Sequence, residues 1–461
     1  MTDPKAADIF KSILQVGKIP DSAGPAPSLK DADQNKANES SASSGDADNQ
    51  GGILAAAAIP TQEGPEGIRY DFNIGLRVQV PEGKWRVRFF DLDTETVFFD
   101  GEGSKSTFGS RKKHYLRAKI EVFRDGVLIF SHIYDATDRP VAILMPGGTI
   151  GDSIAWFTYA ARFKKQHGCK LVVVLADQMK ELLEPAYPDI TFILRKDYLL
   201  KNNEYYATYH LGLFFEDEDN SWQPADFRMV GLHRTAGYIL GVSPEEERPK
   251  LIISGQRPIE EPYVVIATQA SSQCKYWNNP EGWHDVIEFL KRSGYRVICI
   301  DKDMVWGQGL HWNQIPNGCE DQTGARPLSE RANWLKHAEF FVGLSSGLSW
   351  LAWAAGTPVV MISGFTHPTN EFETPYRVFN THVCNSCWHD IRHPFEHNNF
   401  LFCPRHKDTP RQFECTRYIS SSYVIATIRD VLSALSSQEV RSRTTELPPP
   451  ECPPTLAPKP A

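Results

Sequence analysis

Apolar and polar residues alternate with a period of two between residues 67 and 140. The alternation is clear in KWRVRFF and in LRAKIEVFRDGVLIFSHIYD, and it is typical of β-strands that bury one face. Asp125-Gly126 separates two of these runs and supplies the positive φ angles that a tight hairpin turn requires. The pattern therefore predicts a small antiparallel β domain, barrel-like in character, over residues 67–140.

Beyond this segment the pattern changes to apolar, β-branched runs that alternate with amphipathic segments. Seven runs are predicted strands: VAILM (141–145), LVVVLA (171–176), ITFIL (190–194), YVVIAT (263–268), YRVICI (295–300), FFVGL (340–344) and PVVMIS (358–363). Helical periodicity between them, as in 153–166 and 283–294, indicates parallel sheets covered on both faces. The series restarts after Ile259, so we predict two Rossmann-like domains, residues 141–258 and 259–437, that face a cleft.

Both ends of the chain lack these periodic patterns. Residues 1–66 include SASSGDADNQGG, and residues 438–461 end in LPPPECPPTLAPKPA. Such compositions bury too little apolar surface to offset the entropy lost on ordering, so both ends are predicted to be disordered, the second as a polyproline-like tail. Elsewhere the composition, with 41% hydrophobic and 23% charged residues, is that of a globular protein and excludes a collagen or a coiled coil.

The charge pattern narrows the possible partners. The formal charge of −8, from 49 basic and 57 acidic residues, provides no basic excess for nucleic acid or an anionic membrane surface. No apolar run reaches the roughly 18 residues of a transmembrane helix, and the start MTDPKAADIF lacks the features of a secretory signal. We therefore expect a cytoplasmic protein, whose nine cysteines are thiols or metal ligands rather than disulfides.

Three loops at predicted strand–helix junctions carry residues suited to binding an anion. In MPGGTIGD (145–152), small residues and free N–H groups at a helix start favour phosphate, although Asp152 is equally explained as a carboxylate that complements the helix dipole. Lys275 is the one cation of the loop 267–283, either a partner for a diphosphate leaving group or a solvated lysine. GLSSGLSW (343–350) suits helix capping and phosphate binding alike.

Four cysteines in the segment 384–415 follow the spacing C-x2-C-x15-C-x11-C: Cys384, Cys387, Cys403 and Cys415. Four thiolates in a reducing compartment suit one tetrahedral metal ion, and the spacing leaves zinc and iron as alternatives. A closed shell of four ligands leaves no open position for a substrate and so indicates a structural rather than a catalytic site. The segment also carries aromatic residues and histidines that suit a surface for a neighbouring subunit: Trp388, His389, Phe395, His397 and Phe400.

Taken in order, GGTIGDSIAW, QCKYW with a following proline, and VGLSSGLSWLAWAAGTPVV resemble the heptosyltransferase family of glycosyltransferases. With the β segment and the four-cysteine finger, residues 67–437 resemble the autotransporter heptosyltransferases of Gram-negative bacteria. The resemblance implies a GT-B fold with an acceptor-side and a nucleotide-sugar-side domain, and an ADP-glycero-manno-heptose donor. It implies acceptor serines on an adhesin passenger domain, modified before export, one structural iron per chain in the finger, and a dodecamer.

The resemblance also implies roles for individual residues. Asp152 matches the general base of the family, and Lys275 matches the lysine that contacts the donor phosphates. Further donor-contacting positions match in the first and third loops: Thr149, Ile150, Gly151, Ser345, Ser346, Gly347 and Leu348. Lipopolysaccharide heptosyltransferases carry Asp-Thr-Gly-Leu-Ser-His where this chain has Ser345-Ser-Gly-Leu-Ser-Trp350, and this departure argues against a lipid-core acceptor.

The mechanism that follows is an inverting displacement. Asp152 takes the proton of an acceptor serine, while Lys275 and the N–H groups after Ser346 stabilise the departing ADP. Two other functions stay open. A lipopolysaccharide core heptosyltransferase is disfavoured by the β segment and the cysteine finger. A non-catalytic nucleotide-binding scaffold with a metal knuckle is disfavoured by the presence of both Asp152 and Lys275.

Overall fold

A computed structural model describes residues 54–145 and 149–445 of the chain. Most of the N-terminal segment predicted to be disordered, residues 146–148 of the first loop, and the end of the proline-rich tail lie outside the described residues. The last helix, α11 (Ser421–Thr445), continues past residue 437, where the predicted domain ends.

Residues 54–66, which the composition predicts to be disordered, are ordered instead. Leu54 is buried beside Tyr198 and Tyr205, and the Thr61 hydroxyl donates to the Tyr205 carbonyl over 2.6 Å. A short strand, β1 (Gln62–Glu63), then pairs with the start of the next strand. The order comes from contacts with residues more than 130 positions away, which local composition does not report.

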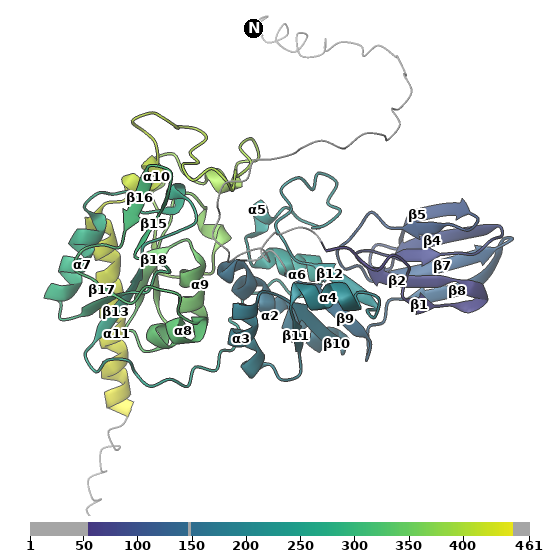
Figure 1. Ribbon diagram of the computed structural model, residues 1–461, viewed down its shortest axis with the longest axis horizontal. Helices are drawn as coiled ribbons and strands as arrows, with labels where there is room; N and C mark the ends of the chain where they lie inside the picture. Colours follow the sequence, from purple (N-terminus) through teal and green to yellow (C-terminus); the bar gives the residue numbers. More distant parts are fainter. Residues whose placement is uncertain (1–53, 146–148, 446–461) are drawn as a thin grey trace, which may run out of the picture. The chain divides into compact units, whose positions relative to one another are not determined.

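The first half of the molecule contains an eight-stranded sheet with the path β11-β10-β9-β12-β2-β3-β6, and β1 pairs with β2 (Figure 1). Its parallel part comprises β9 (Pro140–Leu144), β10 (Lys170–Val174), β11 (Thr191–Ile193) and β12 (Ala207–His210). Side chains of β9 alternate between two cores: Val141 and Ile143 pack with helix α2 (Ile150–His167), whereas Ala142 and Leu144 pack with Tyr198. Both faces of this sheet are therefore covered, as predicted.

The antiparallel segment is divided between two sheets. Three strands extend the first sheet: β2 (Arg69–Asn73), β3 (Arg77–Gln79) and β6 (Thr107–Gly109). Four strands form a separate open sheet in the order β5-β4-β7-β8: β4 (Trp85–Asp91), β5 (Thr96–Gly103), β7 (Ala118–Arg124) and β8 (Val127–Ile133). The predicted hairpin turn is confirmed, because Asp125 and Gly126 join β7 to β8 with φ angles of 48° and 82°.

The second half contains a six-stranded parallel sheet in the order β17-β14-β13-β18-β19-β20. Its strands are β13 (Tyr263–Ala267), β14 (Arg296–Cys299), β17 (Glu320–Asp321), β18 (Phe341–Leu344), β19 (Val359–Ile362) and β20 (Arg377–Val378). Helices α7 (Gly282–Arg292) and α11 lie on one face, and α8 (Leu328–Lys336) and α9 (Gly347–Ala354) lie on the other (Figure 1). All seven strands predicted from apolar runs are present, and this half is Rossmann-like as expected.

Further short elements connect the sheets to the loops around them. They are η1 (Pro65–Gly67), α3 (Asp177–Leu183), η2 (Glu184–Ala186), α4 (Arg195–Lys201), α5 (Phe227–Val230), α6 (Arg234–Leu240), η3 (Gln273–Lys275), β15 (Val305–Gln308), β16 (His311–Gln314), η4 (Pro368–Asn370), η5 (Cys387–His389) and α10 (Glu414–Arg417). Among the residues that the structure describes, none of the helices is both long enough and apolar enough to cross a bilayer.

Candidate functional site

The first and third predicted loops meet where α2 and α9 begin. A Cβ atom on Gly151 would lie 2.9 Å from Cδ1 of Trp350 and 3.4 Å from Cα of Gly347, and a Cβ on Gly347 would lie 3.2 Å from the Gly151 nitrogen. Glycine at both positions therefore allows an approach that any side chain would hinder. The positive ends of two helix dipoles converge at this contact, an arrangement that favours an anion.

Asp152 begins α2 as part of a capping box. Its Oδ2 accepts hydrogen bonds from the Thr149 amide (2.8 Å) and the Thr149 hydroxyl (2.9 Å). Within the described part of the chain, no residue donates to Oδ1. Asp152 therefore caps the start of α2, as one of the two interpretations predicts. The second carboxylate oxygen of this half-buried side chain is not used by the cap. Its role as a base stays a prediction.

Lys275 ends the short helix η3 that follows β13, and it contacts the cysteine finger. Its Nζ atom lies 5.6 Å from the Trp388 ring centroid and 5.7 Å from that of Phe395, and it donates to Ser271 Oγ over 3.5 Å. The finger therefore packs beside this loop, and the role of Lys275 in donor binding stays a prediction. Two aromatic rings of the finger lie beside the lysine that we assigned to the donor.

The pKa of His397, in the finger, responds to charges from both of the first two predicted loops. Partial desolvation and the Lys275 charge hold the pKa of the His397 imidazole below its usual range, while the Asp152 carboxylate acts in the opposite direction. Lys275 and Asp152 are therefore both close enough to act on one side chain of the finger. His397 is exposed, as we expected, but nothing local in the sequence shows that the finger folds back toward the two loops.

A buried carboxylate that sequence reasoning missed supports the third loop. Glu371 Oε1 accepts hydrogen bonds from the Ser345 and Thr366 hydroxyls, both at 2.5 Å, and its Oε2 lies 2.8 Å from Arg377 Nη1. The Ser345 hydroxyl thus holds the loop in place. By contrast, Ser346 Oγ is buried and has no hydrogen-bond partner in the described structure, and its role in donor binding stays a prediction.

The four predicted metal ligands interact with one another. Burial and the neighbouring Cys384 raise the pKa of Cys387 to about 12, and burial followed by the surrounding thiols raises the pKa of Cys415 well above its usual value. Such a cluster suits a cation, because a bound metal relieves the repulsion between thiolates. The chemistry of the donor set therefore suits a metal, but among the described residues the four sulfur atoms do not all lie within 4.8 Å of one another, so the site stays a prediction. The eight cysteines in the described ranges form no disulfide bond with one another.

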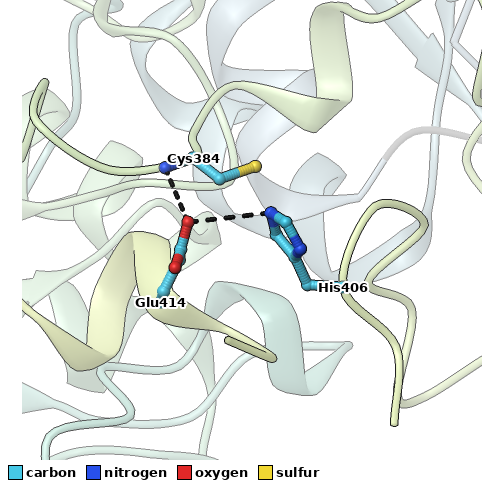
Figure 2. Close-up of side chains that lie close together, drawn as sticks. All are labelled: Cys384, His406 and Glu414. Atoms are coloured by element: carbon cyan, nitrogen blue, oxygen red, sulfur yellow. Dashed lines mark hydrogen bonds and ion pairs between the residues drawn. The ribbon is translucent and has the colours of Figure 1, made fainter. Parts of the chain in front are cut away.

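A second group of possible ligands overlaps the first at one residue. Ligand atoms of Cys384, His406 and Glu414 all lie within 4.8 Å of one another (Figure 2). The Cys384 amide donates to Glu414 Oε1 over 2.9 Å, and His406 Nε2 lies 3.7 Å from the same oxygen. Arg411 also pairs with this carboxylate, at 2.6 Å. Arg405 likewise donates to Cys384 Sγ over 3.6 Å, so cationic partners do not separate the two groups, and the four-cysteine set stays a prediction.

The aromatic residues of the finger form a core rather than the exposed surface that we predicted. Trp388 and Phe400 are only 9% and 6% exposed. The cluster that includes Trp388 also contains Phe227 from the first half of the molecule, and the Phe215 ring lies 5.4 Å from the Trp388 ring. These side chains are therefore occupied by contacts within the chain, which the sequence pattern alone does not show.

Two family models match the chain. Residues 64–126 match the N-terminal domain of the glycosyltransferase TibC, and residues 237–397 match glycosyltransferase family 9, the heptosyltransferases. The first match covers much of the antiparallel segment. The second includes the loops of Lys275 and Ser345 and part of the finger.

Three relatives align over most of the chain. BAHTCr, an autotransporter heptosyltransferase of Citrobacter rodentium, is 51% identical over 388 residues, which are 84% of this chain and 94% of the relative. TibC, an autotransporter heptosyltransferase of Escherichia coli O78:H11, is 51% identical over 385 residues (83% and 94%). BimC of Burkholderia thailandensis, named an inactive autotransporter heptosyltransferase, is 42% identical over 383 residues (82% and 89%).

The fold also matches a solved structure. A crystal structure of TibC, described as a dodecameric, iron-containing heptosyltransferase in complex with ADP-D-β-D-heptose, aligns with a TM-score of 0.80 at 50% identity. The alignment covers 83% of this chain and all of the TibC chain (100%). The GT-B-like α/β fold implied by the sequence is thereby confirmed.

Proposed function

This chain belongs to the autotransporter heptosyltransferases, within glycosyltransferase family 9, and we propose that it transfers heptose from ADP-heptose to serine hydroxyls of an autotransporter passenger domain. The observation that carries the proposal is the contact of Gly151 with Gly347, where α2 and α9 begin and where Asp152 lies in the first turn of α2. A carboxylate and two helix N-termini at this contact, together with Lys275 as the cation, would supply what transfer from a nucleotide diphosphate requires.

The proposed donor is ADP-glycero-manno-heptose, because the crystallised relative TibC holds ADP-D-β-D-heptose. Its diphosphate would accept hydrogen bonds from the N–H groups that open α2 and α9, and the Lys275 ammonium would balance its charge. We assign these donor contacts to residues of the two loops: Thr149, Ile150, Gly151, Ser346, Gly347 and Leu348. Ser345 serves the donor indirectly, through its hydrogen bond to Glu371.

The proposed reaction is a single displacement with inversion. The acceptor serine oxygen bonds to the anomeric carbon while the bond from that carbon to the ADP oxygen breaks, and ADP leaves with the electron pair. The serine proton passes to Asp152 Oδ1, the oxygen that the capping box leaves without a donor. Lys275 and the helix N-termini stabilise the negative charge that develops on ADP.

The finger would hold one metal ion with Cys384, Cys387, Cys403 and Cys415. We propose iron, because the related TibC is iron-containing, with zinc as the alternative that thiolate chemistry allows. When bound, the ion would cross-link the finger and neutralise its thiolates. We further propose a dodecamer, as in TibC, and a cytoplasmic reaction on the passenger before export, which agrees with free thiols at the described cysteines.

A second candidate function is supported by two observations. Asp152 has a complete structural role in the capping box, and one relative that is 42% identical is named inactive. The chain would then be a nucleotide-binding scaffold that transfers no sugar. The transferase and the scaffold would both bind the nucleotide through the two helix N-termini and Lys275. They would differ only in whether the sugar is transferred to an acceptor.

The test is release of ADP from ADP-heptose by the purified protein under three conditions: with a passenger domain, with a lipopolysaccharide core acceptor, and with no acceptor. We expect ADP release that depends on the passenger domain. Release that depends on the lipid acceptor would replace the proposed function with lipopolysaccharide synthesis. If the protein binds ADP but forms no ADP from ADP-heptose under any of the three conditions, the scaffold function would be established.

A further inference from the structure

The loop that carries Lys275 is attached to the finger by two hydrogen bonds to one backbone carbonyl. The Gln273 amide and the Ser272 hydroxyl both donate to the carbonyl oxygen of Phe400, at 2.8 and 2.9 Å. The next residue, Cys274, is 3% exposed and lies in the aromatic cluster of the finger. The finger therefore packs against this loop and helps to hold it in position.

The Lys275 ammonium lies beside the faces of two finger aromatics. Its distances of 5.6 Å to the Trp388 centroid and 5.7 Å to the Phe395 centroid are within the roughly 6 Å over which a cation and an aromatic face attract. Trp388 is buried, whereas Phe395 is half-buried and packs edge-on against His397, with 4.8 Å between ring centroids. The two rings are thus fixed by their own neighbours.

The charge of Lys275 is available for an anion. Across the described ranges, no carboxylate lies within 4.0 Å of its ammonium group, which instead contacts two rings and the Ser271 hydroxyl. An aromatic face attracts a cation without neutralising it, unlike a carboxylate. A lysine side chain also loses considerable rotamer freedom when it is fixed. Because the two rings hold the Lys275 side chain in place before the donor binds, less rotamer freedom is lost on binding.

We propose that Phe395 and Trp388 are positioning residues, which hold the Lys275 ammonium toward the diphosphate of the donor and make the finger part of the donor site. The inference rests on the proposed function, because it takes Lys275 to be the cation for the ADP leaving group. It adds that donor affinity depends on side chains of the finger that bind neither metal nor donor.

The experiment is isothermal titration calorimetry of ADP binding to the full-length protein and to Phe395→Leu, Lys275→Met and the double variant. A lost cation–π contact predicts an ADP affinity about 3- to 10-fold weaker for Phe395→Leu. The double variant should bind ADP no more weakly than Lys275→Met alone, because the ring acts through the lysine. Phe395→Trp retains an aromatic face and should restore most of the affinity.

Phe365→Leu is the matched control, because the Phe365 ring packs 5.3 Å from Phe395 in the same cluster and has no cation contact in the described structure. Its ADP affinity should equal that of the wild type. The proposal is overturned if Phe395→Leu binds ADP normally, if Phe365→Leu weakens binding equally, or if the losses in the double variant are additive. Failure of the proposed function is a separate result: a wild type that binds ADP but transfers no heptose leaves this comparison intact.

Discussion

The indole of Trp350 stands against Gly151 so closely that a Cβ on this glycine would lie 2.9 Å from the indole Cδ1. Trp350 is itself buried and packs edge-on against Phe372, with 5.0 Å between ring centroids. The residue next to the proposed base is therefore fixed by a side chain of the second half.

Gly151→Ala should separate α2 from α9, because a fixed indole and the Gly347 backbone leave no space for a methyl group. We expect ADP affinity and transfer rate to fall at least about 10-fold, roughly 1.4 kcal/mol. Calorimetry and the ADP-release assay measure both. Gly109→Ala is the control, since its Cβ would lie 3.9 Å from the nearest atom outside its chain neighbours. Normal ADP binding by Gly151→Ala would show that the contact does not shape the donor site.

Glu371→Ala should destabilise the fold, because it leaves the largely buried Arg377 guanidinium without its carboxylate. The side chains of Glu371 and Arg377 are 0% and 13% exposed, and loss of one partner of a buried pair costs about 3–5 kcal/mol. Denaturant unfolding measures the change. Glu288→Ala breaks an exposed pair with Arg292 on α7 and should cost less than about 1 kcal/mol. Equal effects of the two variants would refute the assigned role of Glu371.

The pKa of His397 should move in opposite directions in two variants. Lys275 lowers this pKa and Asp152 raises it, so Lys275→Met should raise it toward the usual histidine range and Asp152→Asn should lower it further. The imidazole is neutral above its pKa, so the charged form should persist to higher pH only in Lys275→Met. NMR titration of the imidazole tests the signs. A pKa that is the same in all three proteins would show that the two loops do not meet at His397.

Patterns that depend on neighbouring residues were predictable from the sequence. The seven apolar strands, the hairpin at Asp125-Gly126 and the helix over 153–166 follow from hydrophobic period and turn chemistry. By contrast, β12 was missed, because ATYH is short and mixes polar and aromatic residues. This strand is nevertheless central, since it connects β9 to β2 and so joins part of the antiparallel segment to the first sheet.

The candidate site likewise has parts that could be predicted from the sequence and parts that could not. Its loops were predictable, because glycine and hydroxyl residues at strand–helix junctions have a local signature. Glu371 and His397 were not, because their roles depend on contacts with Ser345 and with Lys275 and Asp152 that only the folded chain creates. The burial of the finger aromatics was missed for the same reason: a core formed between distant segments has no period along the sequence.

Two substitutions distinguish between the two overlapping sets of possible metal ligands. Cys403→Ser removes one of the four predicted thiolates and should lower metal content from about one ion per chain and reduce assembly. His406→Ala alters only the second group and should retain the metal. Elemental analysis with light scattering measures both, and Cys169→Ser, a buried thiol outside the finger, is the control. Metal loss in His406→Ala but not in Cys403→Ser would assign the ion to Cys384, His406 and Glu414.

The central claim is that this chain transfers heptose to a passenger domain with Asp152 as the base. The most direct measurement is the intact mass of an autotransporter passenger co-expressed with the wild type, with Asp152→Asn, or with Asp197→Asn. The amide that Asp152→Asn introduces retains an oxygen that can accept the capping bonds from Thr149, but it cannot take a proton. Asp197 accepts a similar bond from the Leu194 amide at the start of α4, so its variant controls for changes at a helix start.

We predict mass increments of one heptosyl unit each with the wild type and with Asp197→Asn. With Asp152→Asn we predict none, because loss of a general base slows transfer by about 10²–10⁴-fold, although calorimetry should show that this variant still binds ADP. Heptosylation by Asp152→Asn at the wild-type level would remove Asp152 from the mechanism. An unmodified passenger with the wild type would contradict the claim itself.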